Sequence, residues 1–138
     1  MSNLEYSTNR HSYYCLNYHL VVVTKYRHKC INKAILERLK EIAYSIFKKN
    51  KCVIAEINGE ADHVHISFQA PPQVQLSKLI NSFKSVSSRY IRKEFAEHLS
   101  KYYWKPYFWN DSYFILSTGG APQEIIKKYI ENQNSPEN

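Results

Sequence analysis

Four segments of the chain have the residue pattern of β-strands. Residues 13–25 are rich in β-branched and aromatic side chains and contain the run Leu-Val-Val-Val-Thr at 20–24. Residues 52–57 and 112–117 are shorter runs of the same kind. Polar and apolar positions alternate strictly over residues 63–69, as in a strand with one buried face. The Asn-Gly pair at 58–59 predicts a turn between the second and third of these strands.

Three other segments have the period of an amphipathic helix. Residues 32–50 place apolar side chains at i, i+3 and i+4, and Asn32 is a suitable N-cap. A shorter helix is expected near residues 121–133, with Pro122 close to its start. Residues 75–95 predict a long helix, whose apolar stripe is Leu76, Leu79, Ile80, Phe83, Val86, Tyr90 and Ile91.

The order of these elements is βαββαβ followed by one more helix. This is the order of the ferredoxin-like, split-βαβ fold, so we predict the α+β class. We expect a four-stranded antiparallel sheet with strands one and three at its centre. Two helices would cover one face, and the C-terminal helix would carry Tyr129. With 138 residues, the chain suits a single domain spanning 1–138, with a core at about 11–133 and loose tails.

The composition is that of a globular protein. Hydrophobic residues make up 43% and aromatic residues 14%, which is enough for a core and excludes a disordered chain. The three cysteines are an odd, widely spaced set, which argues against a disulfide framework or a cysteine zinc site. No apolar run approaches the ~20 residues of a membrane span, and the N-terminus has no apolar signal core. We therefore expect a cytoplasmic protein without a membrane partner.

The charge balance points to a polyanionic partner. Lys and Arg number 19 against 12 Asp and Glu, a formal net charge of +7. The sequence pI is about 9.3. Such an excess is most often used to bind nucleic acid, although a merely basic surface would look the same.

Candidate chemistry lies on the third strand and the last helix. His63 and His65 are two residues apart and project from one side of a strand, where neutral imidazoles can chelate one divalent ion. A pair of solvated histidines on a polar face is the alternative. Tyr129 and Gln133 are four residues apart and share one helical face. They offer a phenol nucleophile and an amide oxygen, or else a helix whose tyrosine simply packs with Ile125.

Taken together, these motifs resemble the HUH single-tyrosine transposases of the insertion sequence 200/605 family. The resemblance extends from about residue 13 to residue 133. It is carried by Tyr26-Arg27, by Asp62-His63-Val64-His65, by Trp109 with Ser112-Tyr113-Phe114, by Gly119-Gly120, and by Lys128-Tyr129-Ile130-Glu131-Asn132-Gln133.

The resemblance implies an activity and a ligand set. His63, His65 and Gln133 would hold Mg²⁺ or Mn²⁺, and Tyr129 would attack the scissile phosphate to form a 5′-phosphotyrosine. The substrate would be single-stranded DNA with hairpins near the ends of the element, and no nucleotide cofactor is implied. The family also implies a homodimer with composite active sites, in which the tyrosine helix of one chain faces the histidines of the other. Gly119 and Gly120 would be the hinge of that helix, unless they form an ordinary loop.

Basic and aromatic side chains could supply the DNA surface. Cations commonly bind phosphate oxygens, and exposed rings stack on unpaired bases. A solvated helix face and buried aromatic rings are the alternatives for any single residue. The candidate cations are Lys25, Arg27, Lys78, Lys84, Arg89 and Arg92, and the candidate rings are Tyr26, Tyr102, Tyr103, Trp104 and Trp109.

Other functions fit some of these features. A domesticated, palindrome-associated tyrosine transposase would use the same chemistry. A replication-initiator or relaxase-type nickase of the HUH class fits less well, because the chain is short and pairs Tyr129 with Gln133. A DNA-binding module without catalysis would not need the histidines and the tyrosine. A small metal-dependent hydrolase would use water and form no covalent adduct.

Overall fold

The computed structural model describes residues 16–117 and 123–133. Its strands form one antiparallel sheet with the order β2-β3-β1-β4, so the first and third strands are central. The α+β, ferredoxin-like prediction is confirmed in this respect. The strands are β1 (Leu16–Val23), β2 (Val53–Glu60), β3 (His63–Ala70) and β4 (Phe114–Ser117).

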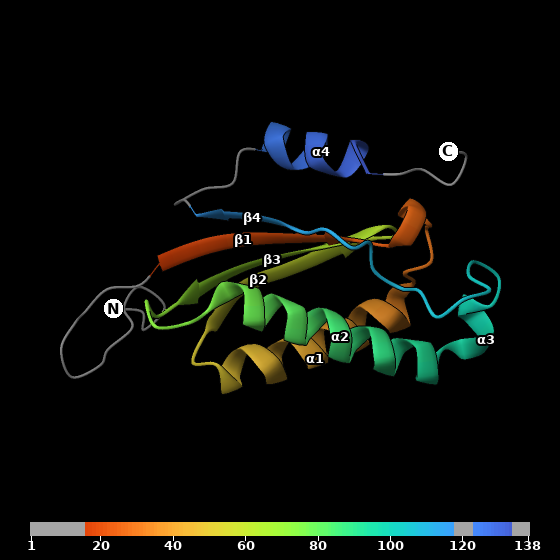
Figure 1. The fold of residues 1–138 in the computed structure, drawn as a ribbon, viewed down its shortest axis with the longest axis horizontal. Helices are drawn as coiled ribbons and strands as arrows, with labels where there is room; N and C mark the ends of the chain where they lie inside the picture. Colours follow the sequence, from red (N-terminus) through yellow and green to blue (C-terminus); the bar gives the residue numbers. More distant parts are fainter. Residues whose placement is uncertain (1–15, 118–122, 134–138) are drawn as a thin grey trace.

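Helices lie on both sides of the sheet. The two long helices, α1 (Lys33–Lys49) and α2 (Leu76–Glu94), cover one face, and α4 (Gln123–Glu131) crosses the other (Figure 1). Asn32 caps α1 as predicted, since its side chain accepts a hydrogen bond of 2.8 Å from the amide of Ile35. Two short helices, η1 (Lys25–Arg27) and α3 (Ala96–Leu99), were not predicted.

The hairpin between β2 and β3 differs from the sequence prediction. Glu60 pairs with His63, so the connection is Ala61-Asp62, and the Asn-Gly pair at 58–59 lies within β2. Gly59 is needed there for a close approach rather than for a turn. A Cβ at this position would lie 2.8 Å from Cδ1 of Leu36 in α1 and 3.0 Å from the carbonyl oxygen of His63.

The main core lies between the sheet and the two long helices. The predicted alternation of β3 is confirmed, because Val64, Ile66 and Phe68 are fully or almost fully buried while the residues between them are only half-buried. The stripe predicted for α2 is correct for Leu79, Ile80, Phe83 and Ile91 but wrong for Tyr90, which is exposed. Its ring lies against the guanidinium groups of Arg38 and Arg89 instead.

A smaller core holds α4 against the opposite face. Val21 and Val23 of β1 are completely buried, and Ile126 of α4 packs on them. Phe114 of β4 and Ile130 lie at the margin of the same cluster. The C-terminal helix therefore docks through its own apolar side onto β1 and β4. Among the described helices, none is both long enough and apolar enough to cross a membrane.

Candidate active site

The two predicted histidines lie side by side on the sheet face that α4 crosses. His63 is opposite Glu60 of β2 and Val23 of β1, and His65 is opposite Asn58 and Val21. Paired residues of antiparallel strands project to the same side, so the imidazoles share a face with the valines beneath α4. Both side chains are half-buried. The face therefore combines an apolar area under α4 with a polar area at the start of β3.

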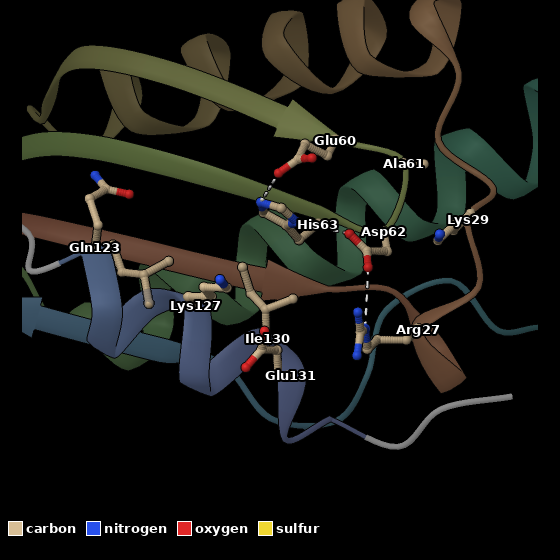
Figure 2. Close-up of a pocket in the computed structure, with 11 residues that line it drawn as sticks. Arg27, Lys29, Glu60, Ala61, Asp62, His63, Gln123, Lys127, Ile130 and Glu131 are labelled. Atoms are coloured by element: carbon tan, nitrogen blue, oxygen red, sulfur yellow. Dashed lines mark hydrogen bonds and ion pairs between the residues drawn. The ribbon is translucent and has the colours of Figure 1, made fainter. Parts of the chain in front are cut away.

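Asp62 fixes the orientation of the first histidine. Its Oδ1 lies 2.9 Å from Nδ1 of His63, and its Oδ2 accepts a hydrogen bond of 3.2 Å from Nε of Arg27 (Figure 2). The hydrogen bond with His63, aided by the one from Arg27, lowers the pKa of this carboxyl even though the residue is buried. With Nδ1 engaged, Nε2 of His63 faces the Glu60 carboxylate at 3.6 Å. The Asp62 carboxylate, which contacts the opposite ring nitrogen, is of the kind that commonly supports a metal-binding imidazole.

The turn that delivers Arg27 has an unusual backbone. Tyr26 and Arg27 have φ values of 59° and 58°, in the left-handed region that side chains with a Cβ rarely adopt. Two hydrogen bonds of the preceding residue, Lys25, hold the start of this turn. The amide of Lys25 donates to the carbonyl of Phe108 at 2.8 Å, and the Lys25 carbonyl accepts from the Tyr103 hydroxyl at 2.6 Å. The strained turn points Arg27 toward Asp62 and leaves Tyr26 exposed.

A third imidazole contacts the second histidine. Nδ1 of His19 in β1 lies 3.1 Å from Nε2 of His65, and the two rings are stacked. Burial lowers the pKa of both imidazoles, although the nearby carboxylate of Glu56 partly opposes this. The pair is thus kept in the neutral form that a metal ion requires of its imidazole ligands.

A pocket of about 550 Å³ opens beside His63, between the β2–β3 hairpin and α4 (Figure 2). Ile126 and Ile130 give it an apolar side. Lys127 lies on its α4 wall. The charged side chains that line the pocket are Arg27, Lys29, Lys127, Glu60, Asp62 and Glu131.

The predicted nucleophile and amide ligand lie on another part of the same face. The hydroxyl of Tyr129 is 2.9 Å from Oγ of Ser112, and its ring packs on Phe114 of β4. Oε1 of Gln133 accepts hydrogen bonds from Asn110 and from Ser112. Neither Tyr129 nor Gln133 is among the residues that line the pocket at His63. Burial also raises the pKa of the Tyr129 phenol. The structure thus brings the two histidines together but holds Tyr129 and Gln133 at the edge strand.

The donor chemistry at the histidines suits a divalent cation, but two imidazoles do not complete a site. Over residues 16–117 and 123–133, no three His, Cys, Asp or Glu side chains are grouped so that they could hold a metal ion. Within the described part of the chain, a third protein ligand would therefore have to be of another type. The amide oxygen of Gln133 is of a suitable type, and it is occupied here by Asn110 and Ser112.

The predicted DNA-binding cations fall into different places. Lys78 and Arg89 are exposed on α2, in the helical layer behind the sheet, away from the histidine face (Figure 1). Lys25 lies near the site and pairs with Asp111 at 3.6 Å, and Arg27 is bound to Asp62. Arg92 bonds Ser88 at 3.1 Å.

Lys84 was predicted to be a cation of the DNA surface, but the structure shows that its side chain is not free on the exposed side of α2. Its half-buried ammonium group donates to three successive backbone carbonyls, those of Asn110, Asp111 and Ser112, at 2.8, 3.0 and 3.3 Å. A lysine whose protons are used in this way supports the loop rather than offering a charge to phosphate.

Three residues of this region have contacts that the sequence does not reveal. His19 lies on the first predicted strand, where the sequence favours a structural histidine over one near His63 and His65, and the structure places its ring against His65. Asn110 and Ser112 contact Gln133 and Tyr129, but their role depends on how α4 docks. The predicted hinge, Gly119 and Gly120, lies outside the described residues.

Comparison with known proteins gives a consistent picture. A family model described as "Transposase IS200 like" matches residues 12–133. The ISDra2 transposase TnpA of Deinococcus radiodurans is 31% identical over 97% of this chain and 95% of that protein. A transposase for insertion sequence element IS200 of Salmonella typhimurium is 26% identical over 89% of this chain and 80% of that protein.

Two solved structures are also similar. A crystal structure of a candidate transposase from Deinococcus radiodurans aligns with a TM-score of 0.84 at 31% identity, over 94% of this chain and 98% of that one. A REP-associated tyrosine transposase bound to a REP hairpin aligns with a TM-score of 0.59 at 10% identity, over 91% of this chain and 68% of that one. At that identity the second match shows a shared fold.

Proposed function

Because this chain belongs to the IS200-like transposase family, we propose that it cleaves and rejoins single-stranded DNA at the ends of an insertion sequence. The reaction would proceed by transesterification through a 5′-phosphotyrosine at Tyr129. The observation that carries the proposal is the His63–His65 pair on the sheet face that the tyrosine helix crosses. Asp62 contacts the ring of His63, and His19 contacts the ring of His65.

The pocket beside His63 has the charges that a phosphodiester would need. Lys29 and Lys127 are exposed cations from different segments of the pocket lining, and Arg27 of the same lining is bound to Asp62. Cationic side chains in a partly enclosed site stabilise the phosphoryl oxygens as charge develops on them. The acidic side chains Glu60 and Glu131 also line the pocket, so its surface carries both signs of charge. Their negative charge favours a cation bound beside the DNA.

We propose Mg²⁺ or Mn²⁺ as the cofactor, held by His63, His65 and Gln133. When bound, the ion would act as a Lewis acid on the scissile phosphate. The role of Asp62 is to orient the ring of His63, and the role of His19 is to orient the ring of His65.

Tyr129 would supply the nucleophile. Its phenol oxygen would form a bond to phosphorus, lose its proton, and displace the 3′-oxygen of the preceding nucleotide as a free 3′-hydroxyl. The phosphodiester energy is kept in the tyrosine ester, so a 3′-hydroxyl can reverse the step on another strand without a nucleotide cofactor. In the docked position the phenol is half-buried, and burial raises its pKa although the contact with Ser112 partly offsets the rise. Its oxygen faces Ser112 and not the histidines, so in this proposal the phenol leaves the docked position before it attacks.

The position of α4 supports a composite site. In this chain the phenol faces Ser112 and the edge strand, while His63 lines the pocket and His65 contacts His19. We propose that α4 moves, and that in a homodimer the tyrosine helix of one chain serves the histidines of the other. Two chains would also hold two DNA ends at once, each through one tyrosine.

The proposal is tested by trapping the covalent adduct. The protein is incubated with Mn²⁺ and a labelled single-stranded element end that carries its hairpin. A denaturing gel should show an adduct, which Tyr129→Phe and added EDTA should each abolish. Tyr44→Phe is the matched control, since Tyr44 is an exposed tyrosine of α1 on the other side of the sheet. Both variants should bind the hairpin equally. An adduct that persists in Tyr129→Phe would overturn the assignment of the nucleophile.

Mixed dimers test the composite site. Tyr129→Phe chains are combined with chains that carry His63→Ala and His65→Ala. If the sites are composite, the mixture should regain adduct formation that neither protein shows alone. Failure of the mixture, while wild-type chains stay active, would instead place the tyrosine and the histidines of one chain in the same site.

A further inference from the structure

Trp104 is the most exposed large hydrophobic residue of the described chain. Its exposed fraction is 90%, in the segment between α3 and β4. The other tryptophan, Trp109, has an exposed fraction of only 7%, and its indole N–H donates to Oγ of Ser87 at 2.9 Å. A tryptophan in water does not gain the free energy that burial of its large ring would provide. Such an exposed ring indicates a surface that a partner covers.

The surface beside Trp104 is a shallow cavity of about 300 Å³. Tyr103 and Tyr107 give it further aromatic edges, and Arg92 and Lys105 give it positive charge. The ammonium group of Lys105 lies 5.4 Å from the centre of the Trp104 ring. An open aromatic face bordered by cations matches one nucleotide, because a base can stack on the ring while its phosphate meets a cation.

This cavity is connected to the candidate active site through direct contacts. The Tyr103 hydroxyl donates to the Lys25 carbonyl at 2.6 Å, and the Lys25 ammonium lies 5.1 Å from the ring of Tyr107. Two residues further along η1, Arg27 binds Asp62, which in turn contacts His63. A strand with its scissile phosphate near the histidines could therefore follow Arg27 and Lys25 to Trp104.

We propose that Trp104 is a stacking platform for an unpaired base of the DNA substrate, and that Arg92 and Lys105 bind the phosphates beside that base. The inference rests on the proposed function for its substrate class, but it concerns binding away from the tyrosine and the metal ligands. The proposal also distinguishes among the aromatic rings that the sequence suggested for base stacking. Trp109 and Tyr103 belong to the core, whereas Trp104 is free to stack.

Tryptophan fluorescence tests the proposal without any cleavage. The chain has two tryptophans, and Trp109 is buried, so emission that responds to a surface ligand reports on Trp104. The protein is titrated in EDTA with an oligothymidylate, and in parallel with a perfectly paired duplex. We expect the unpaired strand to quench the emission and the duplex to have a much smaller effect, since its bases are already stacked. Equal quenching by both would overturn the proposal.

Variants separate stacking from other roles of this surface. Trp104→Ala should weaken binding of the oligothymidylate by roughly 5- to 100-fold, and Trp104→Phe should restore part of the loss. Tyr44→Ala, which removes an exposed ring of α1, is the control and should bind like wild type. Unchanged affinity in Trp104→Ala would exclude the stacking role. So would a weaker self-association of Trp104→Ala in sedimentation without a change in DNA affinity, because the ring would then contact a second copy of the chain.

The two proposals can fail separately. If no covalent adduct forms but the unpaired strand still quenches the fluorescence, Trp104 remains a DNA contact and the proposed chemistry of Tyr129 is overturned. If the adduct forms but Trp104→Ala does not change the DNA affinity, the proposed transposase activity stands and the stacking role of Trp104 is overturned.

Discussion

Nδ1 of His19 lies 3.1 Å from Nε2 of His65, and the centres of the two stacked rings are 5.3 Å apart. One of these nitrogens must carry the proton and the other must accept it. The contact therefore fixes the ring orientation of His65 and couples its tautomer to that of His19. Because the tautomer decides which nitrogen can bind a metal ion, His19 should matter for metal binding even though it lies on another strand.

Replacing His19 with alanine should weaken Mn²⁺ binding. The loss of an outer partner of a metal-binding histidine typically costs about 10- to 100-fold in affinity, and His19→Asn should recover part of it by keeping a hydrogen-bonding group. Calorimetric titration of the protein with Mn²⁺, in the absence of DNA, measures the effect directly.

Asn17→Ala is the control for this experiment. Asn17 is exposed and lies on the same side of β1, two residues before His19. Its replacement should leave the Mn²⁺ affinity unchanged. If His19→Ala bound Mn²⁺ as tightly as wild type, the contact would have no role in metal binding, and tighter binding would show that His19 competes with the metal for His65.

Lys84 should behave differently from the other cations of α2 in DNA binding. Its ammonium group is used by the carbonyls of Asn110, Asp111 and Ser112, whereas Lys78 and Arg89 are exposed. Replacing a lysine that contacts phosphate lowers the slope of log affinity against log salt by about one. Lys84→Met should therefore leave that slope unchanged and instead lower the midpoint of thermal unfolding.

Lys78→Met provides the comparison, since Lys78 has the same charge on the same helix. Its unfolding midpoint should match that of wild type, because the side chain is solvated. The salt slope of Lys78→Met then decides whether α2 contacts DNA at all. A reduced slope in Lys84→Met with an unchanged unfolding midpoint would show that its ammonium group reaches phosphate after all.

Much of the fold could be predicted because it depends on local periodicity. The alternation of residues 63–69 was sufficient to place Val64, Ile66 and Phe68 in the core and His63 and His65 on the other face. The helical spacing of residues 32–50 and the capping side chain of Asn32 were sufficient for α1. These signals are strong because one face of each element is buried and the other is not.

Features that depend on long-range contacts were not predicted. The Asn-Gly pair at 58–59 has the composition of a turn, but both residues pair with β3, and Gly59 is where Leu36 of α1 comes close to the strand. The spacing of Lys84 places it on a polar side of α2. The carbonyls that take up its charge come from a loop 26 residues later, which no local pattern reveals. Tyr90 was misassigned because two arginines, rather than the core, cover its ring.

The position of the tyrosine helix also lies beyond local patterns. Sequence spacing places Tyr129 and Gln133 on one helical face, but it does not say which part of the sheet that face meets. The structure shows that Ile126 packs on Val21 and Val23, and this docking directs Tyr129 toward β4. The resemblance to a family with a mobile helix predicts the chemistry, and the contacts at β4 show what holds the helix in its docked position.

Ser112 is the residue whose removal should loosen that docked position. Its hydroxyl contacts the phenol of Tyr129 at 2.9 Å and donates to Oε1 of Gln133 at 3.2 Å. A hydrogen bond of this kind contributes about 1 kcal/mol, which corresponds to about fivefold in the ratio of docked to undocked helix. In Ser112→Ala, the backbone amides of α4 should exchange with solvent about five times faster than in wild type, while those of α1 and β3 should not change.

Ser117→Ala is the matched control, because Ser117 is an exposed serine at the far end of β4, the strand that follows Ser112. Its amide exchange should equal that of wild type. Since the phenol must leave Ser112 to reach a phosphate, Ser112→Ala should also form the covalent adduct faster, with hairpin affinity unaltered. Faster exchange with slower adduct formation would mean that Ser112 positions the phenol for attack instead of restraining it. Unchanged exchange in α4 would show that the docked helix is held by the packing of Ile126 on Val21 and Val23 alone.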